Sequence, residues 1–115
     1  MSINLDLEKQ PASDSAITIY KAIGKLSLET VNGFIQNMRG EPASYVVVDL
    51  SGVTFLDSAG VGALVSLFVN RRNQGKVLAL AALPPQATAV VTVAGLQNLL
   101  PIYKTIEEAL AKKPQ

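Results

Sequence analysis

The sequence predicts a mixed α/β domain with a mainly parallel sheet of four to five strands and about four helices, in the order β-β-α-β-α-β-α-β-α. Two short apolar segments at the start predict an antiparallel hairpin. After them, β-branched runs alternate with helical apolar patterns, which is typical of βαβ units. We assign all 115 residues to one domain, because this length supports one hydrophobic core and not two.

The hairpin follows from alternation and from turn residues. Ile3, Leu5 and Leu7 alternate with polar residues, which predicts a half-buried first strand. Residues 16–23 are rich in β-branched side chains and predict the second strand. The polar and proline-containing segment 10–14 between them is the expected turn.

The first helix is predicted to begin just after Ser27 and to end at about Arg39. Ser27 is the expected N-cap, and Glu29 stands favourably in the first turn. Gly40 and Pro42 are typical of a helix end. The apolar face repeats with the i, i+3, i+4, i+7 spacing and consists of Val31, Phe34, Ile35 and Met38.

The middle of the chain predicts a strand, a loop, a helix and a strand. The β-branched run 45–50 is bounded by turn residues and is typical of a central strand that is covered on both faces. Residues 51–57 are expected to form a loop, residues 58–73 a helix, and residues 76–82 another strand. The expected core face of this helix consists of Val61, Leu64, Val65 and Phe68.

The last third is expected to add a helix, a short strand and a final helix. Residues 84–95 keep helical apolar spacing but contain several β-branched residues, so a helix is favoured and a strand is the alternative. Residues 99–103 predict the last strand. Thr105 and Glu108 match a capping box that begins a helix through Lys112.

Composition excludes several classes of chemistry. The chain has no cysteine and no histidine, which removes disulfides, most zinc sites, catalytic triads and imidazole acid–base catalysis. We therefore expect a protein that is not an enzyme and that needs no metal or cofactor. The formal net charge is +1 without a basic stripe, so direct binding to nucleic acid is not expected.

No segment predicts export or membrane insertion. The N-terminus alternates apolar and polar residues and lacks the apolar core of a signal peptide. The longest apolar stretch, residues 60–69, is interrupted by Ser66 and is too short to span a bilayer. A cytoplasmic protein is the expectation.

The segment from Asp49 to Gly62 has the strongest functional signal. It leaves the carboxyl end of a buried strand and enters a helix, where open α/β sheets usually place their sites. It lacks the Gly-Lys-Ser/Thr ending of a Walker loop, and Gly60-Val-Gly62 alone is a weak match to a dinucleotide fingerprint. Asp57 and Ser58 stand at the helix start, where one of them is expected to be the N-cap.

One face of the same helix is small or mildly polar. Long charged side chains, which usually cover an exposed face, are absent until Arg71. Such a face either packs tightly inside the domain or offers a partner protein a close approach to the helix backbone. Its residues are Ala59, Gly62, Ala63, Ser66 and Asn70.

Residues 55–64, which read Phe-Leu-Asp-Ser-Ala-Gly-Val-Gly-Ala-Leu, resemble the signature of STAS domains, named for sulfate transporters and anti-sigma factor antagonists. Residues 24–30 are similar to the segment before the family's first helix, residues 46–52 to its central strand, and residues 106–110 to its final helix. The resemblance implies a STAS-like fold. The chain length is most similar to that of the stand-alone bacterial antagonists, which are also called anti-anti-sigma factors.

The resemblance also implies a transcription-regulating phosphoprotein that switches partners. In that family the serine that matches Ser58 is phosphorylated by an anti-sigma factor with serine kinase activity, and a serine phosphatase restores it. The unmodified form captures the anti-sigma factor. Ser27 stands where the family often has an aspartate, and both residues are good N-caps. The partner-binding residues predicted in this way are Ser27, Asp57, Ser58, Ala59, Gly60, Gly62, Ala63, Ser66 and Asn70.

The sequence leaves three alternatives open. Within the family, the chain could be a subunit of a stressosome-like complex or of a lipid-transport ATP-binding cassette system. Outside it, residues 51–62 could cradle the phosphates of a nucleotide, although the lysine and paired carboxylates that turnover needs are missing. The apolar region 90–100 could bind a lipid or small molecule, but core packing explains it better.

Overall fold

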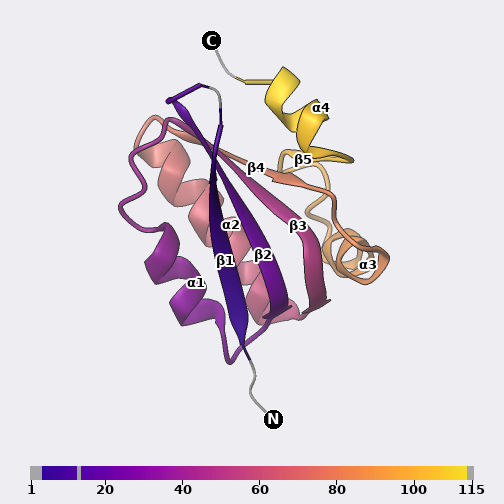
Figure 1. The fold of residues 1–115 in the computed structure, drawn as a ribbon. Coiled ribbons are helices and arrows are strands. Elements are labelled where there is room, and N and C mark those ends of the chain that lie inside the picture. The colour runs from indigo at the N-terminus through magenta and orange to yellow at the C-terminus, as the bar shows by residue number, and fades with distance from the viewer. Residues whose placement is uncertain (1–3, 13, 114–115) are drawn as a thin grey trace.

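The computed structural model describes residues 4–12 and 14–113, and over these residues it has the predicted order of five strands and four helices (Figure 1). The predicted α/β fold class is confirmed. Ile3 of the predicted first strand and Ser13 of the predicted turn lie outside the described residues. The elements are β1 Leu5–Pro11, β2 Ile17–Leu26, α1 Val31–Met38, β3 Tyr45–Leu56, α2 Ser58–Asn73, β4 Val77–Ala81, α3 Pro85–Val93, β5 Ile102–Tyr103 and α4 Ile106–Ala111.

The sheet runs in the order β1-β2-β3-β4-β5. β1 is antiparallel to β2, and all other neighbouring pairs are parallel. Tyr45 of β3 pairs with Ile17 of β2 on one side and with Val77 of β4 on the other. Because four strands are parallel, their carboxyl ends lie at one edge of the sheet, and the helix α2 begins at that edge.

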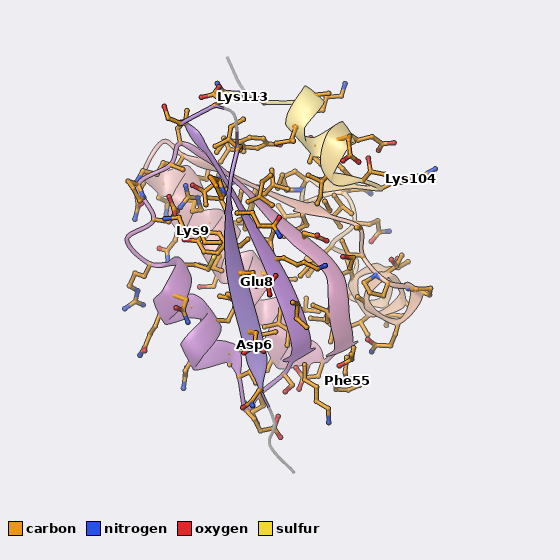
Figure 2. All side chains as sticks on the ribbon, in the orientation of Figure 1. Asp6, Glu8, Lys9, Phe55, Lys104 and Lys113 are labelled. Atoms are coloured by element: carbon orange, nitrogen blue, oxygen red, sulfur yellow. The ribbon has the colours of Figure 1, made fainter. Side chains whose placement is uncertain are left out.

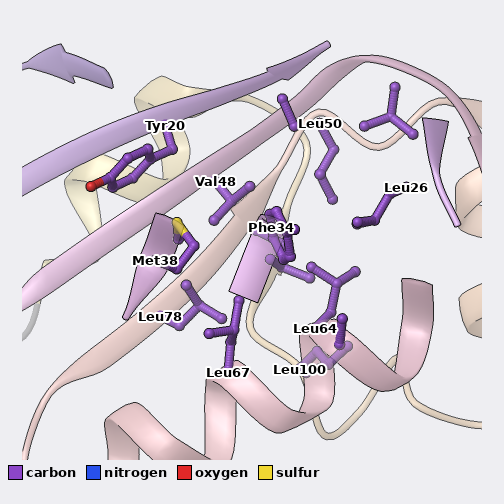
Figure 3. Packing of buried hydrophobic residues seen from close by; sticks show 14 of the residues in the cluster. Tyr20, Leu26, Phe34, Met38, Val48, Leu50, Leu64, Leu67, Leu78 and Leu100 are labelled. Atoms are coloured by element: carbon purple, nitrogen blue, oxygen red, sulfur yellow. The ribbon is translucent and has the colours of Figure 1, made fainter. Parts of the chain in front are cut away.

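The helices cover the two faces of the sheet unequally. α1 and α2 lie beside each other on one face, α3 packs farther along the same core, and α4 lies on the other face (Figure 1). The larger core brings Phe34 of α1, Leu64 of α2 and Val91 of α3 against the central strands. Figure 3 shows part of this packing, with Tyr20, Met38 and Leu78 close together. The smaller core is built around Ala109 of α4 and the opposite side of the same strands.

The prediction of a loop over residues 51–57 is wrong, because β3 continues as a strand to Leu56. Beyond Asp49, β3 pairs with β2 but no longer with β4. One side of the strand is therefore without a strand neighbour, and polar residues that resemble a loop are tolerated there. Two register shifts against β2, between Lys21 and Ile23 and between Gly24 and Lys25, mark bulges. Bulges bend a strand and re-aim its end.

The prediction that Ser27 caps the first helix is also wrong. The N-cap of α1 is Thr30, and residues 27–30 form a turn before it. The Ser27 carbonyl accepts the N–H groups of Thr30 and Val31 at 2.9 and 3.0 Å. The Ser27 side chain is buried, and its hydroxyl donates to Glu29 Oε2 at 2.7 Å. Ser27 therefore organises the turn and not the helix end.

The last third of the chain agrees with the favoured reading. Residues 85–93 form the helix α3, so the strand alternative is wrong, and proline stands at its first position. A proline suits this position because its missing N–H has no helical partner in any case. The last strand is shorter than predicted and spans only Ile102–Tyr103. No helix in the described part of the chain combines the length and apolar character needed to cross a membrane.

Candidate functional site

Asp57 joins the start of α2 to the turn that follows β2. It is the N-cap of α2, with extended backbone angles, and its Oδ1 accepts the Gly60 N–H at 2.8 Å. Its Oδ2 accepts the Leu28 N–H at 3.1 Å. Capping satisfies one of the N–H groups that a helix start leaves free. The second bond fixes the turn of residues 27–30 against the same helix start.

Gly60 lets α2 approach the end of β2 closely. A Cβ atom at this position would overlap the Leu26 carbonyl oxygen and would lie 2.6 Å from Leu56 Cδ1. The Asp57 N–H also points to the Leu26 carbonyl, at 3.4 Å. No larger residue fits without moving the helix away from the sheet. The glycine and the aspartate together fix where α2 begins.

Ser58 is the first residue of α2, and it is exposed. Its hydroxyl makes no hydrogen bond within the residues that the structure describes. Serine at a helix start usually serves as the cap, but here the preceding aspartate has that role. The Ser58 hydroxyl is consequently left available to react or to bind.

Ser58 lies at an open apolar groove of about 670 Å³ between α2 and α3. Among the described residues that line the groove, Ser58 supplies the one polar side chain, and no charged side chain is present. Val93 of α3 also lines the groove, and it is 89% exposed. The lining residues are Ser58, Val61, Gly62, Val65, Ala89, Val90, Val93, Ala94 and Leu96.

Gln86, in the first turn of α3, holds this wall of the groove against β3. Its Oε1 accepts the Leu56 N–H at 2.9 Å, and its Nε2 donates to the Leu56 carbonyl at 2.9 Å. The Gln86 amide thus makes the two backbone hydrogen bonds that a neighbouring strand would make on the side of β3 where β4 no longer pairs. Leu56 pairs with Leu26 on its other side. Since Asp57 follows Leu56 directly, α3 and the start of α2 share one anchor.

Two exposed apolar residues stand near the same edge. Leu28 is 71% exposed and belongs to the turn that Asp57 holds. Phe55 is 43% exposed and projects at the end of β3 (Figure 2). Exposed apolar side chains that gather near one another are typical of surfaces that bind proteins.

Two acidic groups give the edge negative charge. The hydrogen bond from the Ser27 hydroxyl lowers the pKa of Glu29. The Asp57 carboxylate acts in the opposite direction on that pKa, which places the two acids within electrostatic reach of each other. A new negative charge on Ser58 would meet repulsion from Asp57, the residue directly before it. In the part of the chain that the structure describes, no group of three or more acidic side chains could hold a metal ion.

The STAS domain family model matches residues 7–109 of the chain. The chain belongs to the STAS domain family. Among solved structures, an anti-sigma factor antagonist from Mycobacterium paratuberculosis has a TM-score of 0.83 at 19% identity, covering 96% of this chain and 95% of that one. The antagonist SpoIIAA in its unphosphorylated form has a TM-score of 0.73 at 18% identity, covering 95% of both chains.

The same fold occurs inside a transporter. The murine anion transporter Slc26a9 has a TM-score of 0.72 at 20% identity, and the match covers 84% of this chain but 17% of that one. At these identities the likeness establishes a shared fold. The resemblance that residues 55–64 indicate is thereby confirmed at the level of the family.

The STAS fold places the predicted partner-binding residues in three environments. Ser58 and Gly62 are exposed and line the groove, and Ser66 and Asn70 continue the exposed face along α2. Asp57 and Ala59 are half-buried at the helix start. The remaining three are buried, and they are Ser27, Gly60 and Ala63.

The prediction that Ala63 belongs to the outer face of α2 is wrong. The helix turns Gly60, Ala63, Leu64 and Leu67 toward the sheet, with the spacing of one helical face. Val65 and Phe68, which we expected in the core, are half-buried. Gly60 faces inward where α2 approaches the end of β2 closely.

Sequence analysis missed two residues of this STAS site. Gln86 belongs to no recognisable motif. It can bond the Leu56 backbone only because β4 stops pairing with β3 after Asp49. Leu28 is an apolar residue in a turn, which single-sequence patterns do not separate from a buried one. Neither of them gives a signal in one sequence.

Proposed function

We propose that this STAS domain is an anti-sigma factor antagonist that works by partner switching, and that it is a binding module and not an enzyme. The unmodified form binds an anti-sigma factor with serine kinase activity. Phosphorylation of Ser58 releases it, and a serine phosphatase restores it. The likeness to solved antagonists supports the class of function. One observation carries the proposal. Because Asp57 caps the helix, the Ser58 hydroxyl is free of that role, and it lies exposed at an apolar groove.

The fold tolerates a phosphate on Ser58. Phosphorylation adds about −1.5 to −2 charges at neutral pH. The start of α2 attracts negative charge through the helix dipole, by roughly 0.3–1 kcal/mol at an exposed site. No buried group has to move, since Ser58 is already exposed. Phosphorylation therefore leaves the domain folded.

The complex does not tolerate the same phosphate. A partner that covers the groove removes water from Ser58, and the lining supplies no cation to pair with a phosphate. Asp57 and any acid on the partner repel the new charge. A pair of unit charges about 4 Å apart costs up to about 4 kcal/mol at an effective dielectric constant near 20. Since about 1.4 kcal/mol is a tenfold change in affinity, half of that cost is enough to release the partner.

The shape of the site also favours a protein partner. The groove between α2 and α3 is open and apolar, and Leu28 and Phe55 extend apolar surface around the helix start. An apolar side chain of a partner would fill the groove while polar groups surround it, which is the common arrangement of protein interfaces. The anti-sigma factor is therefore expected to place its reactive site over Ser58.

A capture experiment with three variants tests the proposal. Ser58→Ala keeps the surface and cannot be phosphorylated, so it should retain an anti-sigma factor from host lysate. Ser58→Asp adds charge at the groove and should lose that protein. Ser15→Asp adds the same charge in the exposed β1–β2 turn, and it should behave like the native chain. Equal retention by both Ser58 variants would contradict the proposal.

A second candidate role follows from the likeness to a transporter that contains the same fold. In this role the domain would be a subunit of a larger assembly, such as a stressosome-like complex or a lipid-transport system. Gel filtration of the protein captured from its host separates the two roles. A small complex with one kinase-like partner supports partner switching, and a large or membrane-bound assembly supports the second role.

A further inference from the structure

A second polar cluster lies near the other end of α2, around Arg71. Its side chain is buried, with 5% of the residue exposed. Nη2 donates to the Ala43 carbonyl, and Nη1 approaches the Glu41 carbonyl at 3.5 Å. Nε has no hydrogen-bond partner among the described residues. No carboxylate of residues 4–12 or 14–113 forms an ion pair with Arg71.

A buried cation of this kind is unusual. Burial disfavours the charged form and lowers the pKa of Arg71, although an arginine stays protonated at any ordinary pH. Buried charges in proteins are normally paired, because an unpaired one loses its hydration without compensation. Among the described residues, Arg71 has no direct ion pair, and the Glu41 carboxylate acts on it only through space.

Glu41 does not supply the missing contact, because other groups occupy its carboxylate. Glu41 is buried, and its electrostatic effect reaches Arg71 without direct contact. Its two oxygens accept from the Tyr20 hydroxyl at 2.5 Å, the Thr18 hydroxyl at 3.2 Å and the Ala43 N–H at 2.9 Å, and they pair with Lys9 Nζ at 3.0 Å.

The surroundings of Arg71 have an excess of positive charge. Lys9 pairs with the Glu41 carboxylate, and Lys76 Nζ approaches the Glu41 carbonyl at 3.5 Å. Arg39 lies at the end of α1, beside Arg71. The carbonyl ends of α1 and α2 offset part of this charge. Lys9, Arg71 and Lys76 thus lie around Glu41, and Arg39 shares the lining of one cavity with Arg71.

A small cavity is lined in part by Arg71. Its volume is about 40 Å³, and a single water molecule needs roughly 10–15 Å³. No acidic side chain is among the described residues that line it. Four polar side chains that can donate hydrogen bonds and four less polar residues form the walls, and they are Arg39, Asn70, Arg71, Gln74, Ile35, Met38, Gly40 and Leu67.

We propose that this cavity, the Arg71 cavity, binds a small monovalent inorganic anion of the chloride type. The anion accepts from Arg71 and from the donors of Asn70 and Gln74, and it gives the buried guanidinium its counter-charge. The small volume and the single buried cation suit one monoatomic ion. It would tie the end of α1 to the end of α2, far along α2 from Ser58. The inference is independent of the proposed function.

Unfolding in matched salts tests the proposal without any partner. Urea unfolding of the native protein is compared in sodium chloride, sodium bromide and sodium gluconate at equal ionic strength. A ligand that binds the folded state alone stabilises it by mass action. For a dissociation constant of about 0.1 M, chloride at about 0.3 M lowers the unfolding equilibrium constant about fourfold relative to gluconate.

Three variants assign that effect to the Arg71 cavity. Asn70→Leu removes a donor without changing charge, and Arg39→Gln removes a lining cation, so both should abolish most of the chloride effect. Arg72→Gln removes an exposed arginine of the same helix that stacks on Phe68 and does not line the cavity, so it should keep the effect. A bromide anomalous peak beside Arg71 Nε in crystals would agree.

Two results would overturn the proposal. Identical unfolding in chloride and gluconate means that water alone occupies the cavity. A chloride effect that survives both Asn70→Leu and Arg39→Gln means that the ion acts on the protein surface elsewhere.

Discussion

Asp57 Oδ2 accepts the Leu28 N–H at 3.1 Å, while the other oxygen of the same carboxylate caps α2. One side chain therefore fixes two segments that are far apart in the sequence, and it leaves the neighbouring Ser58 without a structural task. The proposed switch depends on these separate roles of two adjacent residues. Changes at Asp57 therefore test the stability of the site, and changes at Ser58 test its function.

Removing the Asp57 carboxylate should destabilise the domain. Asp57→Ala loses the cap and the bond to Leu28, and we expect the free energy of unfolding to fall by about 1–2 kcal/mol. Asp57→Asn keeps one acceptor oxygen and should lose about half as much. Urea unfolding measures both. Asp6→Ala, at an exposed position of β1, is the matched control and should change little.

Gly60 and Gly62 should respond to alanine in opposite directions. Gly60→Ala places a methyl group against the Leu26 carbonyl, and we expect a loss of about 1–3 kcal/mol in unfolding free energy. Gly62 has nothing within 4 Å of the added Cβ. Gly62→Ala should therefore gain about 0.5–1 kcal/mol from helix propensity. Thermal unfolding of the pair checks this, and a similar loss in both variants would disagree with the close approach of α2 to β2.

Loss of the Gln86 amide should loosen α3. Gln86→Leu leaves the Leu56 N–H and carbonyl without their partner, which should cost about 1–3 kcal/mol. Hydrogen exchange should quicken in α3 and at Leu56 before it changes in β2. Gln36→Leu, at an exposed position of α1, is the control. Unchanged exchange at Leu56 in the Gln86 variant would show that the amide is not its anchor.

Glu41 should make stability depend on acid pH. Burial alone would raise its pKa, but hydrogen bonds from Tyr20 and Ala43 and the Lys9 ion pair lower the pKa from 4.5 to about 2. The folded state thus prefers the ionised form, so this contribution is complete above the unfolded pKa and is lost as pH falls from about 4.5 toward 2. Its size is about 3 kcal/mol.

The variant Glu41→Gln isolates this pH dependence. Its unfolding free energy should be lower at neutral pH and nearly flat between pH 5 and pH 2, apart from changes shared with the native chain. Glu107→Gln, at an exposed position of α4, should keep the native profile. Parallel profiles for native protein and Glu41→Gln would contradict the role of Glu41.

The sequence predicts the order of elements well because each element carries its own signal. The run from Tyr45 to Leu50 is apolar except for Asp49 and is buried on both faces, and Asp57 with Ser58 stands where β3 passes into α2. The motif that contains Ser58 is local, so a single sequence is enough to find it. The groove beside Ser58 is not local, since α3 forms half of it.

The errors arise where contacts between distant segments decide the structure. Ser51 and Gly52 resemble a loop, but pairing with β2 keeps them in a strand. Ser27 resembles a cap, but the turn that Asp57 holds buries it. Ala63 resembles an outward residue, but it lies three positions after Gly60 on the helical face that packs against the sheet. None of these contacts leaves a periodic pattern in the sequence.

The most direct test of the account is the intact mass of the native protein after incubation with ATP and host lysate. We expect one added phosphate that maps to Ser58 and that is absent from Ser58→Ala. A phosphate on another residue, or none while the anti-sigma factor is present, would contradict the claim that the uncapped hydroxyl of Ser58 is the regulated group.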